Sequence, residues 1–509
     1  MNKYILLFIE SQWHSLNIDN HSDYKQFIPF ATDNIYVSFQ TSDLLRYFKD
    51  KNVGKLPIII DLECLDKQMS QEGKEFREYS KWMAVHALKY HKIIDSDFSL
   101  TESTFKLFLE HLTILYSNLF EKDNLEQNRF VDLEMRVNTL IYDRQYRGVK
   151  INLEVAKERS IEVERKIYNI KNILQIEYNI FVPDSVQQQI AFLSKKGYNI
   201  IRSPKNTFKI RRFDDPVCNL FYELMRNEQD LESLIYIQSQ WGGQSRTYPT
   251  FYGFGTITSR ITLRQPSLQN LKKENRPVIV PDKDMQFLYI DYSQFEAGIL
   301  ASLSGDENLI KLYNTDIYVD LAEKVLGSKE KRKEAKIIFY RYMYGDNSLG
   351  KEAVDYFNKF EKLKSFMEQI YSDASKHRKV GTTNGNFRYT NGEEYKWALS
   401  HVIQSTASLI FKNALVRVFG EITKAEFVIP MHDAALYQIK NSDYEKCKVK
   451  IINIYIEEFE KLCPEIKAAV GSESYYPQLE TSNLKTVPSL SIEDFEEITK
   501  IDLNLDFGI

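Results

Sequence analysis

The chain has 509 residues, which is enough to bury a large core and to form more than one domain. Its 67 Lys and Arg residues against 71 Asp and Glu residues give a formal net charge of -4, so any nucleic-acid contact must come from a local positive surface rather than from an overall basic excess. The four cysteines form no CxxC pair, which argues against a zinc site and against a disulfide framework.

Residues 1 to about 125 are predicted to form a small α/β unit. Apolar runs of strand length alternate there with segments of helical periodicity. We expect strands over Tyr4–Ile9, Ile35–Phe39 and Leu56–Asp61, and helices over Ser42–Lys49 and the Lys74–His91 region.

The next part of the chain is predicted to be mostly helical. Val131–Asn152 is an apolar helix that ends at Gly148 in a short strand, and Leu153–Tyr178 is a long, charged helix. Arg202–Arg212 is the most basic segment, and we expect it to be a loop. Basic side chains mixed with an aromatic one suit a phosphate backbone, although a solvated surface loop has the same composition.

A strand followed by a helix is predicted over Leu288–Asp306. An apolar run ends at Asp291, and apolar residues then recur at helical spacing from Phe295 onward. A carboxylate at the end of a core strand is costly to bury unless something pairs with it, and a metal ion is a common partner. A helix-capping aspartate would produce the same local pattern.

Lys329–Gly345 is predicted to be a single helix, on which Arg332, Lys336, Tyr340 and Tyr344 follow one another at intervals of four and form one face. Cations at one end and rings at the other fit a nucleoside triphosphate, with the phosphates toward the cations and the base toward the tyrosines. A basic helix face exposed only to solvent is the plainer interpretation.

Two further elements follow. Glu394–Phe411 is predicted to be a helix that contains Gln404. Phe427–Ile439 is predicted to be a hairpin with His432 and Asp433 at its turn, which would place Asp433 beside Asp291 on a neighbouring strand.

The amino-acid sequences of these segments resemble those of the family A DNA polymerases, the bacterial polymerase I and phage replicase group. Asp291–Glu296 is similar to motif A, and the helix with Arg332, Lys336, Tyr340 and Tyr344 is similar to motif B. Met431-His432-Asp433 is similar to motif C, while Thr258-Ser259-Arg260 and Pro266–Asn270 resemble the segment that precedes motif A. The resemblance covers roughly residues 131 to 476.

This resemblance implies an α/β (α+β) right-hand fold with a thumb at about 150–250, a palm at about 251–305 and 381–476, and fingers at about 306–380, within a polymerase domain over 126–476. Asp61-Leu62-Glu63 resembles the first motif of a 3′–5′ exonuclease domain. Residues 1–125 lack convincing further motifs, so we expect a reduced, non-catalytic domain. Residues 477–509 form an acidic tail.

Nucleotidyl transfer by a two-metal mechanism needs carboxylates that hold two Mg²⁺ ions. The resemblance assigns Asp291, Asp433 and the Tyr292 backbone carbonyl as the metal ligands. Arg332 and Lys336 would hold the triphosphate, and Lys336 would also act in catalysis by protonating the leaving pyrophosphate.

The resemblance also assigns residues that select the nucleotide. Glu296, packed against Tyr344, would fill the space of a ribose 2′ hydroxyl, which favours deoxynucleotides and argues against the single-subunit RNA polymerases. Tyr340 stands where many members carry Phe, so we expect ready use of dideoxynucleotides. Tyr318 stands where the family usually has a phosphate-binding His, which adds it to the nucleotide site.

Contacts to primer and template are assigned in the same way. The DNA-binding candidates are Arg260, Asn270, Gln294, Gln404 and His432. Gly298 stands where an Arg is common, and Ala434 replaces the usual acid after the motif C aspartate.

We therefore expect a DNA-directed DNA polymerase that acts on primer–template DNA and dNTPs, as a monomer in the cytoplasm of a bacterium or a phage-infected host, in phage or mobile-element replication or repair. Copying of RNA templates and a catalytically inactive DNA-binding relic are the alternatives. The tail sequence DLNLDF resembles peptides that dock on a sliding clamp, although an ordinary tail would have similar composition. No run of about 18 apolar residues indicates a membrane span, and no signal peptide is indicated.

Overall fold

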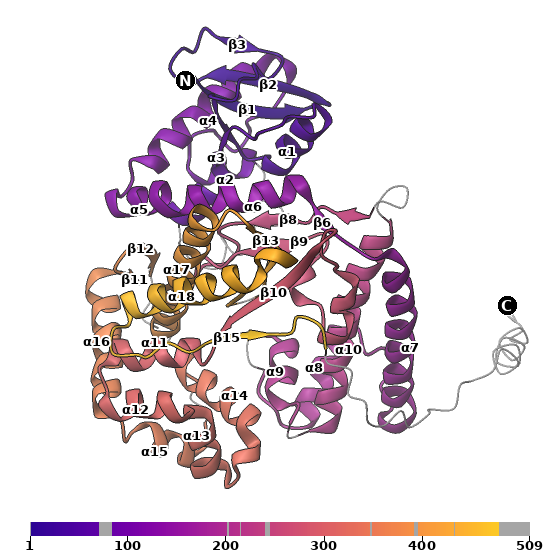
Figure 1. Ribbon diagram of the computed structural model, residues 1–509, viewed down its shortest axis with the longest axis vertical. Coiled ribbons are helices and arrows are strands. Elements are labelled where there is room, and N and C mark those ends of the chain that lie inside the picture. Colours follow the sequence, from indigo (N-terminus) through magenta and orange to yellow (C-terminus); the bar gives the residue numbers. More distant parts are fainter. Residues whose placement is uncertain are drawn as a thin grey trace, which may run out of the picture.

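The computed structural model of the protein describes residues 2–70, 84–200, 203–213, 215–239, 245–346, 349–390, 395, 397–431 and 433–477. Over these residues the chain is a mixed α/β structure with an N-terminal unit at one end, a central four-stranded sheet and two helical regions below it (Figure 1). No described helix is long and apolar enough to cross a membrane.

The N-terminal unit is built on a five-stranded sheet of order β3-β2-β1-β4-β5, in which β1, β4 and β5 run parallel and β1 pairs with β2 antiparallel. Alternate residues of β1 enter two different cores, with Tyr4 and Leu6 on one face and Ile5 and Leu7 on the other. The three predicted strands are confirmed. The strands are β1 (Lys3–Ile9), β2 (Gln12–Asn17), β3 (Tyr24–Lys25), β4 (Ile35–Ser38) and β5 (Ile58–Asp61).

Helices cover both faces of this sheet. One face packs on α1 (Thr41–Asp50), which confirms the predicted helix over Ser42–Lys49. The other face packs on α2 (Leu62–Met69), α3 (Ala84–Tyr90) and α4 (Phe105–Phe120), preceded by a 3-10 turn at Glu102–Thr104. Of the predicted Lys74–His91 helix, α3 is present, and residues 71–83 lie outside the described residues.

A continuous helical segment joins the N-terminal unit to the rest of the chain. It consists of α5 (Asn124–Arg129), a π-helical turn (Phe130–Glu134) and α6 (Met135–Arg147). The helix ends as predicted at Gly148, whose φ is +73° and where an added Cβ would lie 2.5 Å from the Tyr248 ring. The strand β6 (Val149–Lys150) follows and pairs with β7 (Arg246–Thr247).

The region expected as the thumb contains two long helices, α7 (Leu153–Tyr178) and α10 (Pro216–Ser239), with α8 (Val186–Lys195) and α9 (Pro204–Arg211) at one end (Figure 1). The prediction of a basic loop over Arg202–Arg212 is wrong, because α9 occupies most of it. Ser203 caps that helix and Pro204 occupies its first turn, a strong helix-start signal.

The central sheet has the order β13-β14-β10-β15 and is antiparallel throughout, with strands β10 (Met285–Tyr292), β13 (Ala425–Met431), β14 (Ala434–Lys440) and β15 (Val470–Glu473). The predicted strand–helix passage continues into α11 (Phe295–Ser304), and the predicted hairpin over Phe427–Ile439 is confirmed. The sheet packs on α11, α17 (Trp397–Glu421) and α18 (Tyr444–Leu462). Helix α17 confirms the helix predicted around Gln404.

The remaining helices form the region expected as the fingers, at the lower left of Figure 1. They are α12 (Glu307–Thr315), α13 (Ile317–Leu326), α14 (Arg332–Met343), α15 (Lys351–Phe357) and α16 (Glu361–His377). A 3-10 turn at Lys329–Lys331 precedes α14, so the predicted Lys329–Gly345 helix is nearly continuous. The other short elements are β8 (Thr250–Tyr252), β9 (Thr262–Arg264), β11 (Lys379–Thr382), β12 (Gly385–Tyr389) and 3-10 turns at Leu268–Asn270, Lys273–Val278 and Asn441–Asp443.

The tip of the α7–α10 region has a small core of its own. Phe208 and Phe221 stack with ring centroids 4.3 Å apart, and Leu174 and Leu193 pack with them. These side chains are separate from the core beneath the central sheet, so the tip is stabilised by few apolar contacts.

We predict that Phe221→Ala unfolds this tip locally, because removing a buried Phe costs about 3–5 kcal/mol. Hydrogen exchange should show loss of protection in α8 and α9 while amides of β10 and β14 stay protected. Phe221→Leu, which keeps most of the apolar volume, is the control. Equal loss of protection in the central sheet would contradict a separate core.

Candidate active site

Asp291 and Asp433 lie at the same end of the central sheet. Strand β10 pairs with β14 in a register that sets Asp291 opposite Ala434, and Asp433 immediately precedes Ala434 at the hairpin turn. Neighbouring strands are about 5 Å apart, so the register brings together the two carboxylates that the sequence predicted on adjacent strands. On its other side, Asp291 pairs with Gly471 of β15.

The electrostatics of this pair favour a cation. Burial raises the pKa of Asp291 to about 6, and the carboxylates of Asp433 and Glu473 add to the rise while Lys336 opposes it. Two neighbouring carboxylates form an oxygen donor set suited to a hard divalent ion. No cluster of three or more His, Cys, Asp or Glu side chains suited to a metal occurs among the described residues. The assignment of Asp291 and Asp433 as metal ligands stays a prediction.

Arg260 connects Asp433 to Glu296. Its guanidinium forms a short ion pair with Glu296, and one of its nitrogens lies 3.5 Å from Oδ1 of Asp433. Glu296 is 3% exposed; burial raises its pKa to about 7, and Asp433 adds to the rise while Arg260 opposes it. From the sequence we expected Glu296 to pack against Tyr344. In the structure, the Glu296 carboxylate forms its ion pair with Arg260.

Helix α14 presents the predicted cationic and aromatic face. Arg332 donates from Nε to Oδ2 of Asp316 at 2.7 Å, and its guanidinium lies 5.2 Å from the ring centre of Tyr318. The Lys336 ammonium lies 5.7 Å from the Tyr318 ring centre and 5.8 Å from that of Tyr340. Tyr318 is 1% exposed, so both cations contact the ring of a buried tyrosine through cation–π interactions.

The tyrosines of this face continue toward α17. The rings of Tyr340 and Tyr344 are stacked with centroids 6.0 Å apart, and Gln404 donates to the Tyr344 hydroxyl at 2.6 Å. Tyr344 and Gln404 line a cavity of about 430 Å³ together with Thr256, Thr258, Arg388, Trp397 and His401. The cavity therefore adjoins the face that carries the cations.

Two further DNA-binding candidates, Gln294 and Asn270, also form hydrogen bonds within the protein. The amide of Gln294 donates to the Tyr313 carbonyl at 3.0 Å and accepts from the Ile317 N–H at 2.9 Å, so both ends of its side chain are engaged. Asn270 donates to Ser267 at 2.7 Å. His432 lies outside the described residues. The DNA contacts of all these residues remain predictions.

Two departures from the resembling pattern have a physical cause. At Gly298 an added Cβ would lie 2.8 Å from the Tyr313 ring and 2.9 Å from Phe459, so the helix leaves no room for a side chain there. Ala434 is 1% exposed and faces a closely packed core. An acid at position 434 would therefore be buried in this core.

The acids of the N-terminal unit serve structural contacts. Asp61 accepts from the Cys64 N–H at 2.9 Å as the cap of α2 and from the Tyr142 hydroxyl of α6 at 2.7 Å. Glu63 forms an ion pair with Lys67. These engagements suit the expected non-catalytic role.

Sequence reasoning missed Asp316, which holds Arg332 and caps α13 through the N–H groups of Tyr318 and Val319. Its position directly before a helix is an N-cap signal, although the second contact, to a residue 16 positions away, is not readable from local sequence.

The chain is similar in sequence to proteins of known family. Residues 225–475 match the family model described as DNA polymerase family A. Among curated proteins, DNA polymerase I of Caldicellulosiruptor bescii is 24% identical over 384 residues, which are 64% of this chain and 44% of that protein. DNA polymerase I of Borreliella burgdorferi is 25% identical over 414 residues, 70% of this chain and 44% of that protein. The match thus spans less than half the length of these relatives.

A solved structure has the same fold. The POL domain of Pol1 from M. smegmatis, in complex with DNA primer-template and dNTP, superposes with a TM-score of 0.71 at 15% identity and covers 93% of this chain and 95% of that chain. The α/β right-hand fold expected from the sequence is therefore confirmed. The family match over residues 225–475, the DNA polymerase I relatives and the shared fold all support the resemblance of this chain to DNA polymerase family A.

Proposed function

We propose that this protein is a template-directed DNA polymerase that adds deoxynucleotides to a primer 3′ hydroxyl. The observation that supports this most directly is the meeting of Asp291 and Asp433 at one end of the β10–β14 ladder, with Lys336 of α14 close enough to oppose the pKa rise of Asp291. Acids that gather a metal and cations that hold a triphosphate are the groups that nucleotidyl transfer needs.

Asp291 and Asp433, with the Tyr292 carbonyl, would hold Mg²⁺, in the two-ion arrangement expected from the sequence. The ions, when bound, supply a Lewis acid that activates the primer hydroxyl and neutralises the triphosphate. In this proposal Arg332, oriented by Asp316, binds the outer phosphates. Lys336 stabilises the charge that develops on the departing pyrophosphate and donates it a proton.

The sugar of the nucleotide would meet Glu296 and Tyr340. Arg260 fixes the Glu296 carboxylate by a buried ion pair, so the side chain blocks the space of a 2′ hydroxyl rather than rotating away from it. Burial raises the pKa of Tyr340, so its hydroxyl stays protonated and can donate a hydrogen bond.

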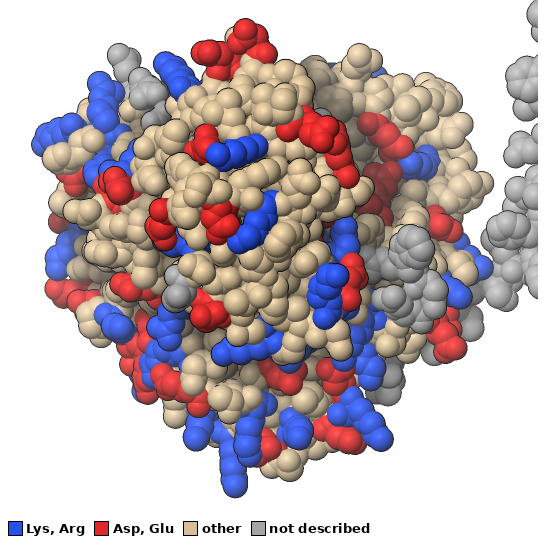
Figure 2. Space-filling model, turned by 90° about the horizontal axis from the view of Figure 1, so that it is seen from above, with Lys and Arg blue, Asp and Glu red and all other residues tan. Residues whose placement is uncertain are grey.

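Primer–template DNA would contact both the central region and the thumb. The cavity lined by Tyr344 and Gln404 has room and polar groups for a template base. In the thumb, partial desolvation and the positive charges of Arg212, Arg226 and Lys205 lower the pKa of Lys209. DNA phosphates would offset this repulsion between cations. By contrast, basic and acidic side chains are interspersed on the face seen in Figure 2.

We propose a monomeric cytoplasmic enzyme of phage or mobile-element replication or repair, without proofreading by the N-terminal unit. Docking on a sliding clamp would use the tail, which lies outside the described residues. Copying of RNA templates is an open alternative.

We predict that Asp291→Asn and Asp433→Asn each lower the rate of primer extension about 10³-fold or more, since loss of a metal ligand removes several kcal/mol of transition-state stabilisation. Single-turnover extension with Mg²⁺ measures this. The control is Glu473→Gln, an exposed carboxylate that also raises the pKa of Asp291. No extension by the unaltered protein would favour the inactive-relic alternative.

We predict that Tyr340→Phe makes the enzyme reject dideoxynucleotides about fivefold more strongly, because one hydrogen bond of about 1 kcal/mol that replaces the missing 3′ hydroxyl is lost. The ratio of kcat/KM for a dideoxynucleotide and its dNTP measures this. Tyr342→Phe, on the same helix but stacked on Phe357, is the control. An unchanged ratio in Tyr340→Phe would refute the assignment.

We predict that Lys209→Gln weakens duplex binding regardless of sequence and reduces the slope of log affinity against log salt concentration by about 1, the value for one lost phosphate contact. Binding titrations at several salt concentrations measure this. Lys446→Gln, an exposed lysine on α18, should leave the slope unchanged. Equal slopes in all three proteins would place the thumb surface outside the DNA contact.

A further inference from the structure

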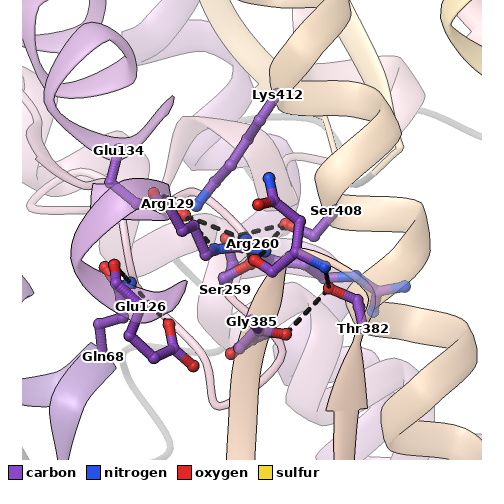
Figure 3. A network of polar contacts seen from close by, with 12 residues as sticks. Gln68, Glu126, Arg129, Glu134, Ser259, Arg260, Thr382, Gly385, Ser408 and Lys412 are labelled. Carbon is purple, nitrogen blue, oxygen red and sulfur yellow. Dashed lines mark hydrogen bonds and ion pairs between the residues drawn. The ribbon is translucent and has the colours of Figure 1, made fainter. Parts of the chain in front are cut away.

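Three charged side chains are fully buried beneath the active site. Arg129, Glu134 and Lys412 are each 0% exposed. Arg129 donates from Nε to Oε1 of Glu134 at 3.1 Å, and Lys412 donates to Oε2 at 2.6 Å (Figure 3). Removal of such ions from water costs several kcal/mol each, and an apolar cluster of similar volume is often at least as stable. Stability alone therefore does not account for the cluster.

The other nitrogens of Arg129 extend the cluster to the segment before β10. Nη1 donates to the Asn384 carbonyl at 3.2 Å, and Nη2 donates to Oγ of Ser259 at 3.0 Å. The guanidinium is a rigid planar fork, so contacts at all three nitrogens fix its orientation completely.

Ser259 has an unusual backbone. Its φ is +58°, in the left-handed region, which costs a residue with a Cβ about 1–2 kcal/mol. The Ser259 hydroxyl accepts from Arg129 and donates to Ser408 at 3.1 Å, while the Ser408 hydroxyl donates to the Ser259 carbonyl at 2.9 Å. A strained conformation persists only where its surroundings hold it, and such positions are concentrated at functional sites.

The residue after Ser259 is Arg260, which pairs with Glu296 and lies 3.5 Å from Asp433. The backbone direction at Ser259 therefore decides whether the Arg260 side chain enters the active site. A change of φ at Ser259 to an ordinary value would turn Arg260 away from both acids.

The π-helical turn at Phe130–Glu134 makes this arrangement possible. In a regular α-helix, residues five apart point about 140° away from each other around the axis, and the wider π turn brings Arg129 and Glu134 together. Single π turns inside helices are rare and are frequent at functional sites.

We propose that Arg129 is a positioning residue for nucleotidyl transfer, which holds Ser259 in its left-handed conformation and thereby directs Arg260 to Glu296 and Asp433. This inference rests on the proposed polymerase function. It predicts a catalytic defect that is transmitted through Arg260 and is separable from the loss of a buried charge.

The test compares Arg129→Met with Lys412→Met in single-turnover primer extension. Each variant removes one buried cation and leaves Glu134 paired with the other, but only Arg129→Met loses the bond to Ser259. We expect Arg129→Met to lower kcat about tenfold or more relative to Lys412→Met, as a displaced active-site group does. Each variant is also combined with Arg260→Ala, and thermal unfolding of every protein is recorded.

The inference holds if the defect of Arg129→Met disappears in the Arg260→Ala background and Arg129→Lys restores part of the rate. Equal defects in both Met variants, or additive defects with Arg260→Ala, overturn it. If Arg129→Met does not fold, Ser259→Ala replaces it in the test, because this variant removes only the hydroxyl that Arg129 contacts. An inactive unaltered protein would refute the proposed function, whereas an active one with equal variants refutes only this inference.

Discussion

The repulsion between the Asp291 and Asp433 carboxylates is the constraint on which the rest of the site depends. The register of β10 against β14 fixes these acids side by side, where they cannot separate without breaking the ladder. The surrounding positive groups, Arg260 and Lys336, come from two other segments of the chain and reduce this repulsion. Lys336 is the expected triphosphate contact and Arg260 the expected primer–template contact, so under the proposed function the same two cations would both balance the acids and bind the substrates.

Arg260 is the cation whose placement is most demanding. It serves a buried carboxylate, Glu296, and a partly exposed one, Asp433, so its side chain has a narrow range of useful directions. A flexible loop would not hold it there. The strained Ser259, held from two sides by Arg129 and Ser408, supplies that rigidity from within the core.

The local features of this chain could be predicted from sequence because local physics determines them. Helix α7 begins and ends as predicted since Asn152 caps its start, and the left-handed Asn179 ends it. The wrong prediction, the basic loop at α9, arose because its charge was given more weight than the Ser203–Pro204 start signal. The Arg129–Ser259 contact spans 130 positions, and no periodicity or motif encodes such a pairing.

The N-terminal unit stabilises the support of Arg260, and this role does not require nuclease chemistry. Gln68 of α2 donates to Glu126 of α5 at 2.7 Å, and Glu126 also accepts from the Phe387 N–H at 2.7 Å. Glu126 thus connects α5 to helix α2 of the N-terminal unit and to the β11–β12 hairpin, one turn before Arg129. Asp61, bonded to Tyr142 of α6, secures the other side of the same helical segment. Loss of these contacts would loosen the base from which Arg129 reaches Ser259, so the acids that resemble an exonuclease motif have a structural reason to be present.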